Sequence, residues 1–314
     1  MKVSLVVPCY NEEENIALFY KAVTEAFDGE IEDYELIFVD DGSKDRTLER
    51  LKAIYEISDC VKVVSFSRNF GKEAAIYAGL QNSEGDYTCV IDADLQQRPE
   101  VVIQMKNMLD RYPEIDCVAA YQEVRKESKA MTFLKDKFYA LINKISDVEF
   151  YSGASDFRLM RRNMVDAVLN MSEYHRFSKG LFSFVGFNTE YIPYQVYERE
   201  AGESKWNVVS LFKYAIEGIV GYTTTPLRFA TAAGIASILI SVLYLIIALI
   251  VGACIHKITA SIAIITLILF LVGLNFVFIG IAGEYLARTY MQGKNRPIYI
   301  AKEILKHGDE DGKE

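Results

Sequence analysis

Two aspartates separated by one small residue are the strongest chemical signal in the chain. Asp92, Ala93 and Asp94 directly follow a short apolar run that ends at Val90 and Ile91. Such a run is typical of a buried parallel strand, and open α/β sheets bind ligands at the carboxyl ends of their strands. Both carboxylates can turn toward one hard cation, which takes oxygen ligands and often keeps substrate phosphates in its shell. An isolated pair of this kind is more often an acidic surface loop. Its meaning therefore depends on the surrounding elements.

Strand-like and helix-like segments alternate around this pair over the first part of the chain. Short apolar runs predict strands at Val3–Val7, Glu35–Val39, Val61–Ser65, Tyr87–Ile91 and Cys117–Tyr121. The segments between them predict helices at Glu13–Phe27, Thr47–Ile57, Lys72–Asn82 and Glu100–Arg111. Asn11 is the expected N-cap of the first helix with Glu14 as its capping-box partner, and Asp45 is the expected cap of the second. The alternation predicts an α/β fold, a mostly parallel sheet flanked by helices.

The first four predicted strands end in polar segments. These segments are PCYNE from Pro8, DDGS from Asp40, SRNFGK from Ser67, and the pair that begins at Asp92. No G-x-G-x-x-G follows the first strand, which argues against a dinucleotide site. Turn chemistry could explain any one segment. Four of them at one edge of a parallel sheet favour a shared ligand.

Composition bounds the class of protein. The 314 residues are 51% hydrophobic and 25% charged, which is ample for a folded core. A net charge of −9 argues against nucleic acid as the main partner, because a basic surface would be expected. The five cysteines are scattered and never in C-x-x-C spacing, so we expect reduced thiols. The apolar run at the amino terminus is too short for a signal peptide.

Two long apolar stretches near the carboxyl end predict a transmembrane hairpin. Phe229–Ile255 and Ile262–Ala282 each approach the ~20 residues that cross a bilayer, and only 256–261 connect them. A buried core hairpin is the alternative. Positive residues flank both outer ends, so we expect both termini in the cytoplasm. The mixed aromatic and cationic segment Trp206–Tyr222 is expected to lie in the membrane interface.

Four segments together resemble a known family. VVPCYNEEEN, VDDGS, SRNFGKEAA and DADLQQRPE, in this order, are similar to family 2 glycosyltransferases with a GT-A fold. SRNFGKEAA and RxxGxSKW at 199–206 resemble the polyprenyl-phosphate glycosyltransferases, relatives of bactoprenol glucosyltransferases and dolichol-phosphate mannose synthase. The resemblance implies an inverting transfer of one sugar from a nucleotide diphosphate sugar to an undecaprenyl-type phosphate. UDP-glucose and UDP-N-acetylglucosamine are the favoured donors.

The resemblance also implies roles for individual residues. Nucleotide binding is expected at Pro8, Tyr10, Glu12, Asp40, Asp41, Lys72, Asp92 and Ala93. A Mg²⁺ or Mn²⁺ ion is expected at Asp92, Asp94 and Gln96. Asp156 is the expected base or acceptor-positioning carboxylate, and Asp94 is the second catalytic residue. The lipid phosphate is expected at Arg125, Arg199, Ser204 and Lys205, with Arg176 and Lys179 as weaker candidates. Asp156 could instead be a turn aspartate, and Lys72 a surface lysine.

The expected organisation has four parts. They are a cytoplasmic GT-A catalytic domain at 1–205, interfacial amphipathic helices at 206–228, two transmembrane helices at 229–285 and a cytoplasmic tail at 286–314. The expected partners are the nucleotide sugar, the polyprenyl phosphate and membrane lipid, without nucleic acid, and a homo-oligomer is left open. The alternative functions are a processive polysaccharide synthase, although the Q-x-x-R-W acceptor motif is absent, and a non-catalytic membrane scaffold.

Overall fold

The computed structural model describes most of the sheet-forming part of the chain and the long carboxyl-terminal helix. The described residues are 1–122, 143, 151, 154–195 and 260–307, with 227, 229, 230, 232–237, 239, 240, 242, 243, 246 and 247.

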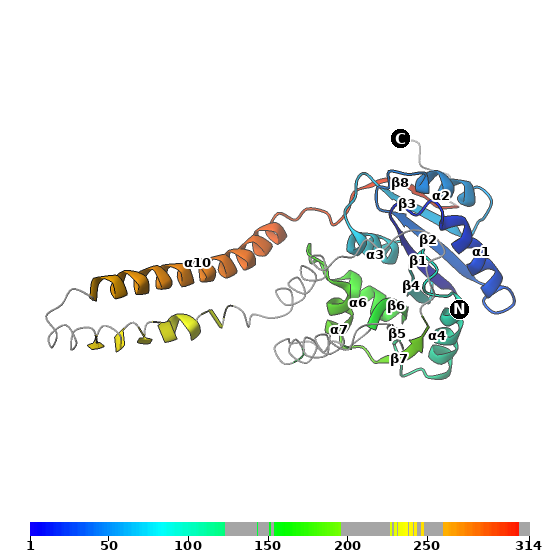
Figure 1. The fold of residues 1–314 in the computed structure, drawn as a ribbon. Helices are drawn as coiled ribbons and strands as arrows, with labels where there is room; N and C mark the ends of the chain where they lie inside the picture. The colour runs from blue at the N-terminus through cyan, green and yellow to red at the C-terminus, as the bar shows by residue number, and fades with distance from the viewer. Residues whose placement is uncertain are drawn as a thin grey trace.

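A single eight-stranded sheet organises the described residues, in the order β7-β5-β6-β4-β1-β2-β3-β8 (Figure 1). The strands are β1 (Val3–Cys9), β2 (Tyr34–Asp40), β3 (Val61–Phe66), β4 (Tyr87–Val90), β5 (Cys117–Gln122), β6 (Ala154–Arg161), β7 (Thr189–Tyr194) and β8 (Ala301–Leu305). β1 lies between β2 and β4 and is parallel to both, and β3 is parallel to β2. β6 runs antiparallel between β4 and β5, and β8 runs antiparallel to β3. The five predicted strands are confirmed within two residues, whereas β6, β7 and β8 were not predicted.

Helices cover both faces of the sheet. They are α1 (Ile16–Phe27), α2 (Thr47–Tyr55), α3 (Lys72–Gln81), α4 (Glu100–Arg111), α6 (Arg162–Leu169) and α7 (Ser178–Phe184). Side chains of β1 alternate between the faces, as a strand requires. Leu5 and Val7 join the core under α1, α2 and α4, whereas Val6 joins the core under α3, α6 and α7. Gly79 lets α3 approach β1 closely, because a Cβ there would lie 2.1 Å from a methyl carbon of Val6. The fold is the predicted mostly parallel α/β sheet.

The predicted capping box of the first helix is wrong. α1 begins at Ile16, and Asn15 occupies the N-cap position without a side-chain cap hydrogen bond. Asn11 is in the left-handed region at φ 55°, which asparagine tolerates better than most residues. Its side chain instead accepts the backbone N–H of Lys44 at 2.9 Å, across to the loop after β2. The N-cap position of α2 is occupied by Arg46 rather than by the predicted Asp45, although Asp45 accepts the backbone N–H of Thr47 at 3.0 Å.

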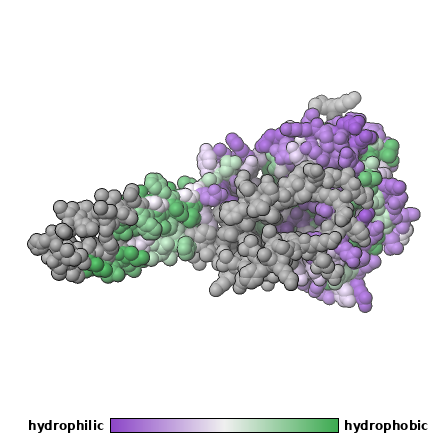
Figure 2. Space-filling view, in the orientation of Figure 1, coloured by the Kyte–Doolittle hydropathy of each residue, from purple (hydrophilic) through white to green (hydrophobic). Residues whose placement is uncertain are grey.

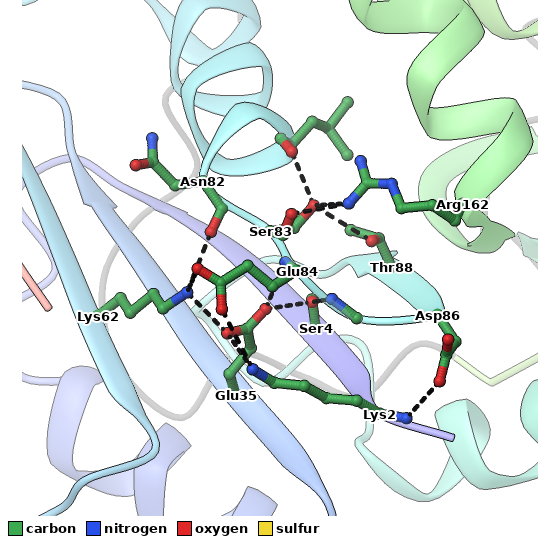
Figure 3. A network of polar contacts seen from close by, with 12 residues as sticks. Lys2, Ser4, Glu35, Lys62, Asn82, Ser83, Glu84, Asp86, Thr88 and Arg162 are labelled. Atoms are coloured by element: carbon green, nitrogen blue, oxygen red, sulfur yellow. Dashed lines mark hydrogen bonds and ion pairs between the residues drawn. The ribbon is translucent and has the colours of Figure 1, made fainter. Parts of the chain in front are cut away.

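A buried polar network lies at the amino-terminal end of the parallel strands, opposite the edge where the strands end (Figure 3). The Glu35 carboxylate lies 2.9 Å from the ammonium groups of both Lys2 and Lys62 and accepts the Ser4 hydroxyl at 2.5 Å. Glu84 also pairs with Lys62 at 2.8 Å. Burial opposes ionisation of Glu35, but these hydrogen bonds outweigh it and lower its pKa to about 2. The network therefore fixes the start of β1, β2 and β3.

One long apolar helix projects away from the sheet. α10 (Ala260–Gly293) contains a stretch, Phe270–Gly293, that is long and apolar enough to cross a membrane. Large side chains such as Phe270 and Phe276 are 65% and 69% exposed. In Figure 2 the coloured residues of this arm are mostly hydrophobic, whereas those around the sheet are mainly hydrophilic.

A second helical segment lies beside α10. Residues 232–237 are helical, and a Cβ at Gly234 would lie 3.7 Å from the ring of Phe278. The residues that would connect the two segments, 248–259, lie outside the described part. The transmembrane hairpin, the interfacial segment 206–228 and the four-part organisation therefore stay predictions. The segment predicted as a tail, 286–314, includes β8 and thus contributes a strand to the sheet.

Candidate active site

The loops that follow β1 and β2 are joined at the carboxyl edge of the sheet. Cys9 is in register with Asp40, so both strands end at the same level. The buried Asp40 carboxylate accepts the backbone N–H of Ser43 at 3.1 Å and the Ser65 hydroxyl at 3.1 Å. The N–H of Asn11 donates to the Ser43 hydroxyl at 3.0 Å. Asp40 therefore organises the loop edge at which its predicted nucleotide contact would form.

Asp41 holds the loop that follows β3. Its two carboxylate oxygens accept the backbone N–H groups of Phe70 at 2.6 Å and Gly71 at 2.9 Å. Burial raises the pKa of Asp41, although both N–H groups favour the ionised form. Gly42 adjoins the same loop at φ +64°, and a Cβ there would lie 2.5 Å from the carbonyl carbon of Arg68. The predicted nucleotide contact of Asp41 stays a prediction, because this carboxylate is engaged by the loop backbone.

Asp92 and Asp94 lie in a tight turn directly after β4. The Asp92 N–H donates to the Gln97 side-chain oxygen at 3.0 Å, and the Asp94 carboxylate accepts the Gln96 N–H at 3.2 Å. Leu95 adopts φ 57°, which costs a non-glycine residue roughly 1–2 kcal/mol. Backbone strain of this kind is found most often at functional sites. Gln97 was not predicted as a site residue, yet its side chain also contacts the Asp92 carboxylate at 3.4 Å.

Lys72 connects the predicted donor side to the predicted acceptor side. Its ammonium group lies 2.7 Å from the Asp92 carboxylate and 3.5 Å from that of Asp156. The antiparallel register pairs Val90 with Arg158, so the next residues along β4 and β6 bring Asp92 and Asp156 together. Burial lowers the pKa of Lys72, but the two carboxylates outweigh it and raise that pKa overall. Lys72 is therefore a permanent cation at the start of α3.

The Asp156 carboxylate is ionised and only partly satisfied. Burial raises its pKa, but attraction from Lys72, Lys179 and Arg158 outweighs burial and lowers the pKa below its usual value. Its Oδ1 is buried and has no hydrogen-bond partner among the described residues. A buried acceptor without a donor costs about 1–3 kcal/mol. The predicted role of Asp156 as a base or acceptor-positioning carboxylate stays a prediction.

Glu73 is a site residue that the sequence did not indicate. Its carboxylate accepts both the backbone N–H of Ser178, at 2.8 Å, and the Ser178 hydroxyl at the start of α7. Burial and the negative charge of Asp156 raise the pKa of Glu73 to about 7. An acidic residue in the first turn of a helix is common for reasons of the helix dipole alone. Nothing in the sequence therefore distinguished Glu73.

Tyr10 lies in the loop after β1 with Glu12, Ala93 lies between the two aspartates after β4, and Lys179 lies in α7. Pro8 lies within β1, one residue before its end at Cys9, and the Glu12 N–H in the loop beyond the strand donates to the Thr47 hydroxyl at 2.8 Å. Arg176 donates to the Met171 and Val168 carbonyl oxygens, at 2.7 and 3.2 Å, which gives it a structural role. The predicted lipid-phosphate ligands lie outside the described residues, and they are Arg125, Arg199, Ser204 and Lys205.

The residues after β4 fit a divalent cation by their chemistry. Two carboxylates and the Gln96 amide are oxygen ligands, and Mg²⁺ and Mn²⁺ take such ligands together with phosphate oxygens. The Asp92 side chain is 31% exposed, so a ligand can reach it. Within 1–122, 154–195 and the rest of the described chain, no group of three His, Cys, Asp or Glu side chains converges on one point. A cation here would need oxygen atoms of the substrate to complete its shell.

The mostly parallel sheet, with polar segments at its strand ends, agrees with the predicted GT-A fold. The model of glycosyl transferase family 2 matches residues 4–169. The chain belongs to this family.

Two relatives match most of this chain and most of their own length. The prophage bactoprenol glucosyl transferase homolog of Escherichia coli (strain K12) is 37% identical over 98% of this chain and 100% of its own length. The bactoprenol glucosyl transferase of Shigella phage SfII is 39% identical over 96% of this chain and 98% of its own. Among solved structures, the mannosyltransferase PcManGT of Pyrobaculum calidifontis in complex with GDP-Man and Mn²⁺ is 15% identical. It superposes with a TM-score of 0.48 and covers 93% of this chain and 86% of its own.

Proposed function

We propose that this chain transfers one sugar from a nucleotide diphosphate sugar to the phosphate of a membrane-embedded polyprenol, with inversion at the anomeric carbon. The observation that carries the proposal is the position of Lys72 between Asp92 and Asp156. One side chain spans the distance between the donor-side and acceptor-side carboxylates. A donor and an acceptor bound at these two groups would meet at the carboxyl edge of the sheet.

The donor half consists of the loops after β1, β2 and β4. Asp92, Asp94 and Gln96 would hold Mg²⁺ or Mn²⁺, which when bound neutralises charge that develops on the leaving diphosphate. The base and ribose would lie along Pro8, Tyr10, Glu12 and Asp40, where carboxylates can accept ribose hydroxyl or base N–H groups. Lys72 would exchange its contact with Asp92 for a diphosphate oxygen when the donor binds, since a charge-assisted contact to phosphate is strong.

The lipid phosphate in the acceptor half of the site has to be oriented, and it needs little help in losing a proton. A phosphate monoester has a second pKa of about 6, so the lipid phosphate is largely ionised at neutral pH. One of its oxygens attacks the anomeric carbon and forms the new C–O bond, while the bond from that carbon to the diphosphate breaks and its electrons leave with the nucleotide. Asp156 would orient the sugar or acceptor through its Oδ1, which accepts no hydrogen bond from the part of the chain that the structure describes. Arg125, Arg199, Ser204 and Lys205 would hold the lipid phosphate.

The names of the relatives support glucose as the sugar and an undecaprenyl-type phosphate as the acceptor. UDP-glucose is therefore the first donor to test, with UDP-N-acetylglucosamine as the second. The apolar α10 supports attachment to the cell membrane. We further propose that two spans form a hairpin, with the catalytic domain and both termini in the cytoplasm.

The experiment is an assay of purified full-length protein with radiolabelled nucleotide sugars, undecaprenyl phosphate and Mn²⁺ or Mg²⁺. Label that becomes extractable into organic solvent, in an amount that never exceeds one sugar per lipid, supports the proposal. Products with many sugars per lipid would instead indicate a polysaccharide synthase. No transfer from any donor in the panel would indicate a non-catalytic membrane protein.

A further inference from the structure

The end of α10 is bonded directly to the catalytic domain. The side-chain amide of Gln292 donates to the Ser172 carbonyl at 2.8 Å, and its oxygen accepts the Tyr174 N–H at 2.8 Å. Both groups belong to the loop between α6 and α7. An amide side chain that bonds one carbonyl and one N–H of the same loop fixes both the distance and the orientation of the helix end.

The chain then makes a second attachment at the edge of the sheet. β8 pairs with β3, and the Ile300 carbonyl accepts the Ser67 N–H at 3.0 Å. The Tyr299 ring stacks on Phe66 at a centroid distance of 4.8 Å, and its hydroxyl donates to the Gln81 side chain at 2.9 Å. Lys52 and Glu303 add an ion pair at 2.6 Å.

Both attachments lead to the first turn of α3. The loop bound by Gln292 continues into Ser178, which bonds to Glu73. The strand covered by β8 continues into Phe70 and Gly71, which bond to Asp41 immediately before Lys72. The segment that follows α10 therefore reaches the two loops on either side of the lysine that connects Asp92 and Asp156.

We propose that residues 292–305 form a positioning strap, which fixes the Lys72–Asp156 pair at the depth where a lipid phosphate lies in the bilayer. Gln292 and Tyr299 are its positioning residues and do not touch substrate. The strap rests on the proposed function, because only an acceptor held in the membrane requires the catalytic domain to keep a fixed height above it. An acceptor that arrives from water does not require this.

The experiment compares two acceptors with the same full-length protein in phosphatidylethanolamine–phosphatidylglycerol vesicles. One acceptor is undecaprenyl phosphate in the vesicle, and the other is geranyl phosphate added from water. Gln292→Met keeps the side-chain length but loses both hydrogen bonds, whereas Gln292→Glu keeps the acceptor atom only. Thr289→Ala is the matched control, because the Thr289 hydroxyl bonds to Tyr285 within α10.

We expect Gln292→Met to lower kcat/KM for the embedded acceptor about tenfold, mainly through KM, since two hydrogen bonds are lost. The same variant should change kcat/KM for geranyl phosphate less than about twofold, with Gln292→Glu intermediate. Tyr299→Ala should give the same pattern.

Equal losses of kcat/KM for both acceptors, or no loss for the embedded acceptor, would overturn the proposal of a positioning strap. A wild-type protein that transfers sugar to neither acceptor would instead overturn the proposed function, so the two failures are distinguishable.

Discussion

At the scale of single residues, the Lys72 ammonium group holds two carboxylates that would otherwise repel each other. Asp92 and Asp156 belong to the ends of neighbouring strands, and each lies within ion-pair distance of Lys72. Attraction to Lys72 is also one reason why the pKa of Asp156 is low despite burial. Removal of this cation should therefore affect both halves of the site.

Lys72→Met should lower kcat about a hundredfold, because an electrostatic contact to a charged intermediate or leaving group is typically worth 2–4 kcal/mol. The acidic limb of the pH–rate profile should also move to higher pH, since the pKa of Asp156 rises when Lys72 is lost. Steady-state kinetics from pH 3 to 9 measure both effects, because the pKa of Asp156 in wild type lies below its ordinary value of 3.8. Lys72→Arg keeps the charge and should leave the limb in place, whereas an unmoved limb in Lys72→Met would argue against the contact.

Glu73→Gln should change the pH dependence of stability. The pKa of Glu73 is raised to about 7 in the folded protein, so the folded state retains a proton that the unfolded state loses near pH 4.5. Stability from this group is therefore fully present below about pH 4.5 and is lost as pH rises through 7. The thermal midpoint of Glu73→Gln relative to wild type should rise between pH 5 and pH 8. A constant difference across that range would contradict the raised pKa.

Some of these residues were predictable and others were not. The position of Asp92 and Asp94 was predictable, because an apolar run directly before two carboxylates identifies the carboxyl end of a strand. The contact between Lys72 and Asp156 was not predictable, because it depends on the insertion of antiparallel β6 beside β4. Asp156 and Arg158 interrupt the apolar pattern of β6 with charges, so the strand itself was missed.

At the scale of elements, the loops after β2 and β3 depend on the absence of a side chain at Gly42. Gly42→Ala would place a Cβ against the backbone of Arg68 and Asn69 at a positive φ. We expect a loss of about 2–4 kcal/mol in unfolding free energy, from strain at this backbone conformation and from overpacking.

Chemical denaturation measures this loss, and Gly29→Ala is the control. Gly29 has a similar φ of +72° but no atom within 4 Å of a Cβ. Equal losses in the two variants would show that the contact with the loop after β3 contributes nothing.

The parallel strands β1 to β4 were predictable, because each is buried on both faces of the sheet and its sequence is therefore a continuous apolar run. β8 was not, because only alternate residues of this five-residue edge strand are half-buried, and its partner lies more than two hundred residues earlier in the chain. Short edge strands carry little apolar signal of their own. The sequence therefore could not show that the chain returns to the sheet after its apolar helix.

At the scale of the whole molecule, the two ends of the parallel strands differ in function. The end where the strands stop carries the candidate site, and the opposite end carries the Glu35 network (Figure 3). Glu35→Gln leaves the charges of Lys2 and Lys62 without their buried partner. It should lower the unfolding free energy at pH 7 by about 3 kcal/mol, which corresponds to the lowered pKa of Glu35.

The sign of the pH effect follows from the same pKa. The ionised form of Glu35 stabilises the fold fully above about pH 4.5, and this contribution is lost as pH falls toward 2. Wild type and Glu35→Gln should therefore differ most at pH 7 and converge near pH 2, as measured by circular dichroism during denaturation in detergent. A difference that stays constant with pH would refute an ionised, paired Glu35.

The proposed sugar transfer depends on a cation that is held by Asp92 and Asp94 and binds the donor diphosphate. The most direct test is calorimetric titration of UDP and GDP into full-length protein, with Mn²⁺ or with excess chelator. Asp94→Asn is the test variant, and Asp166→Asn, an exposed carboxylate on α6, is the control. We predict that wild type and the control bind one of the two nucleotides only with Mn²⁺, and that Asp94→Asn weakens this binding about a hundredfold or more. Nucleotide binding that is equally tight with chelator, or unchanged in Asp94→Asn, would contradict a cation site at Asp92 and Asp94.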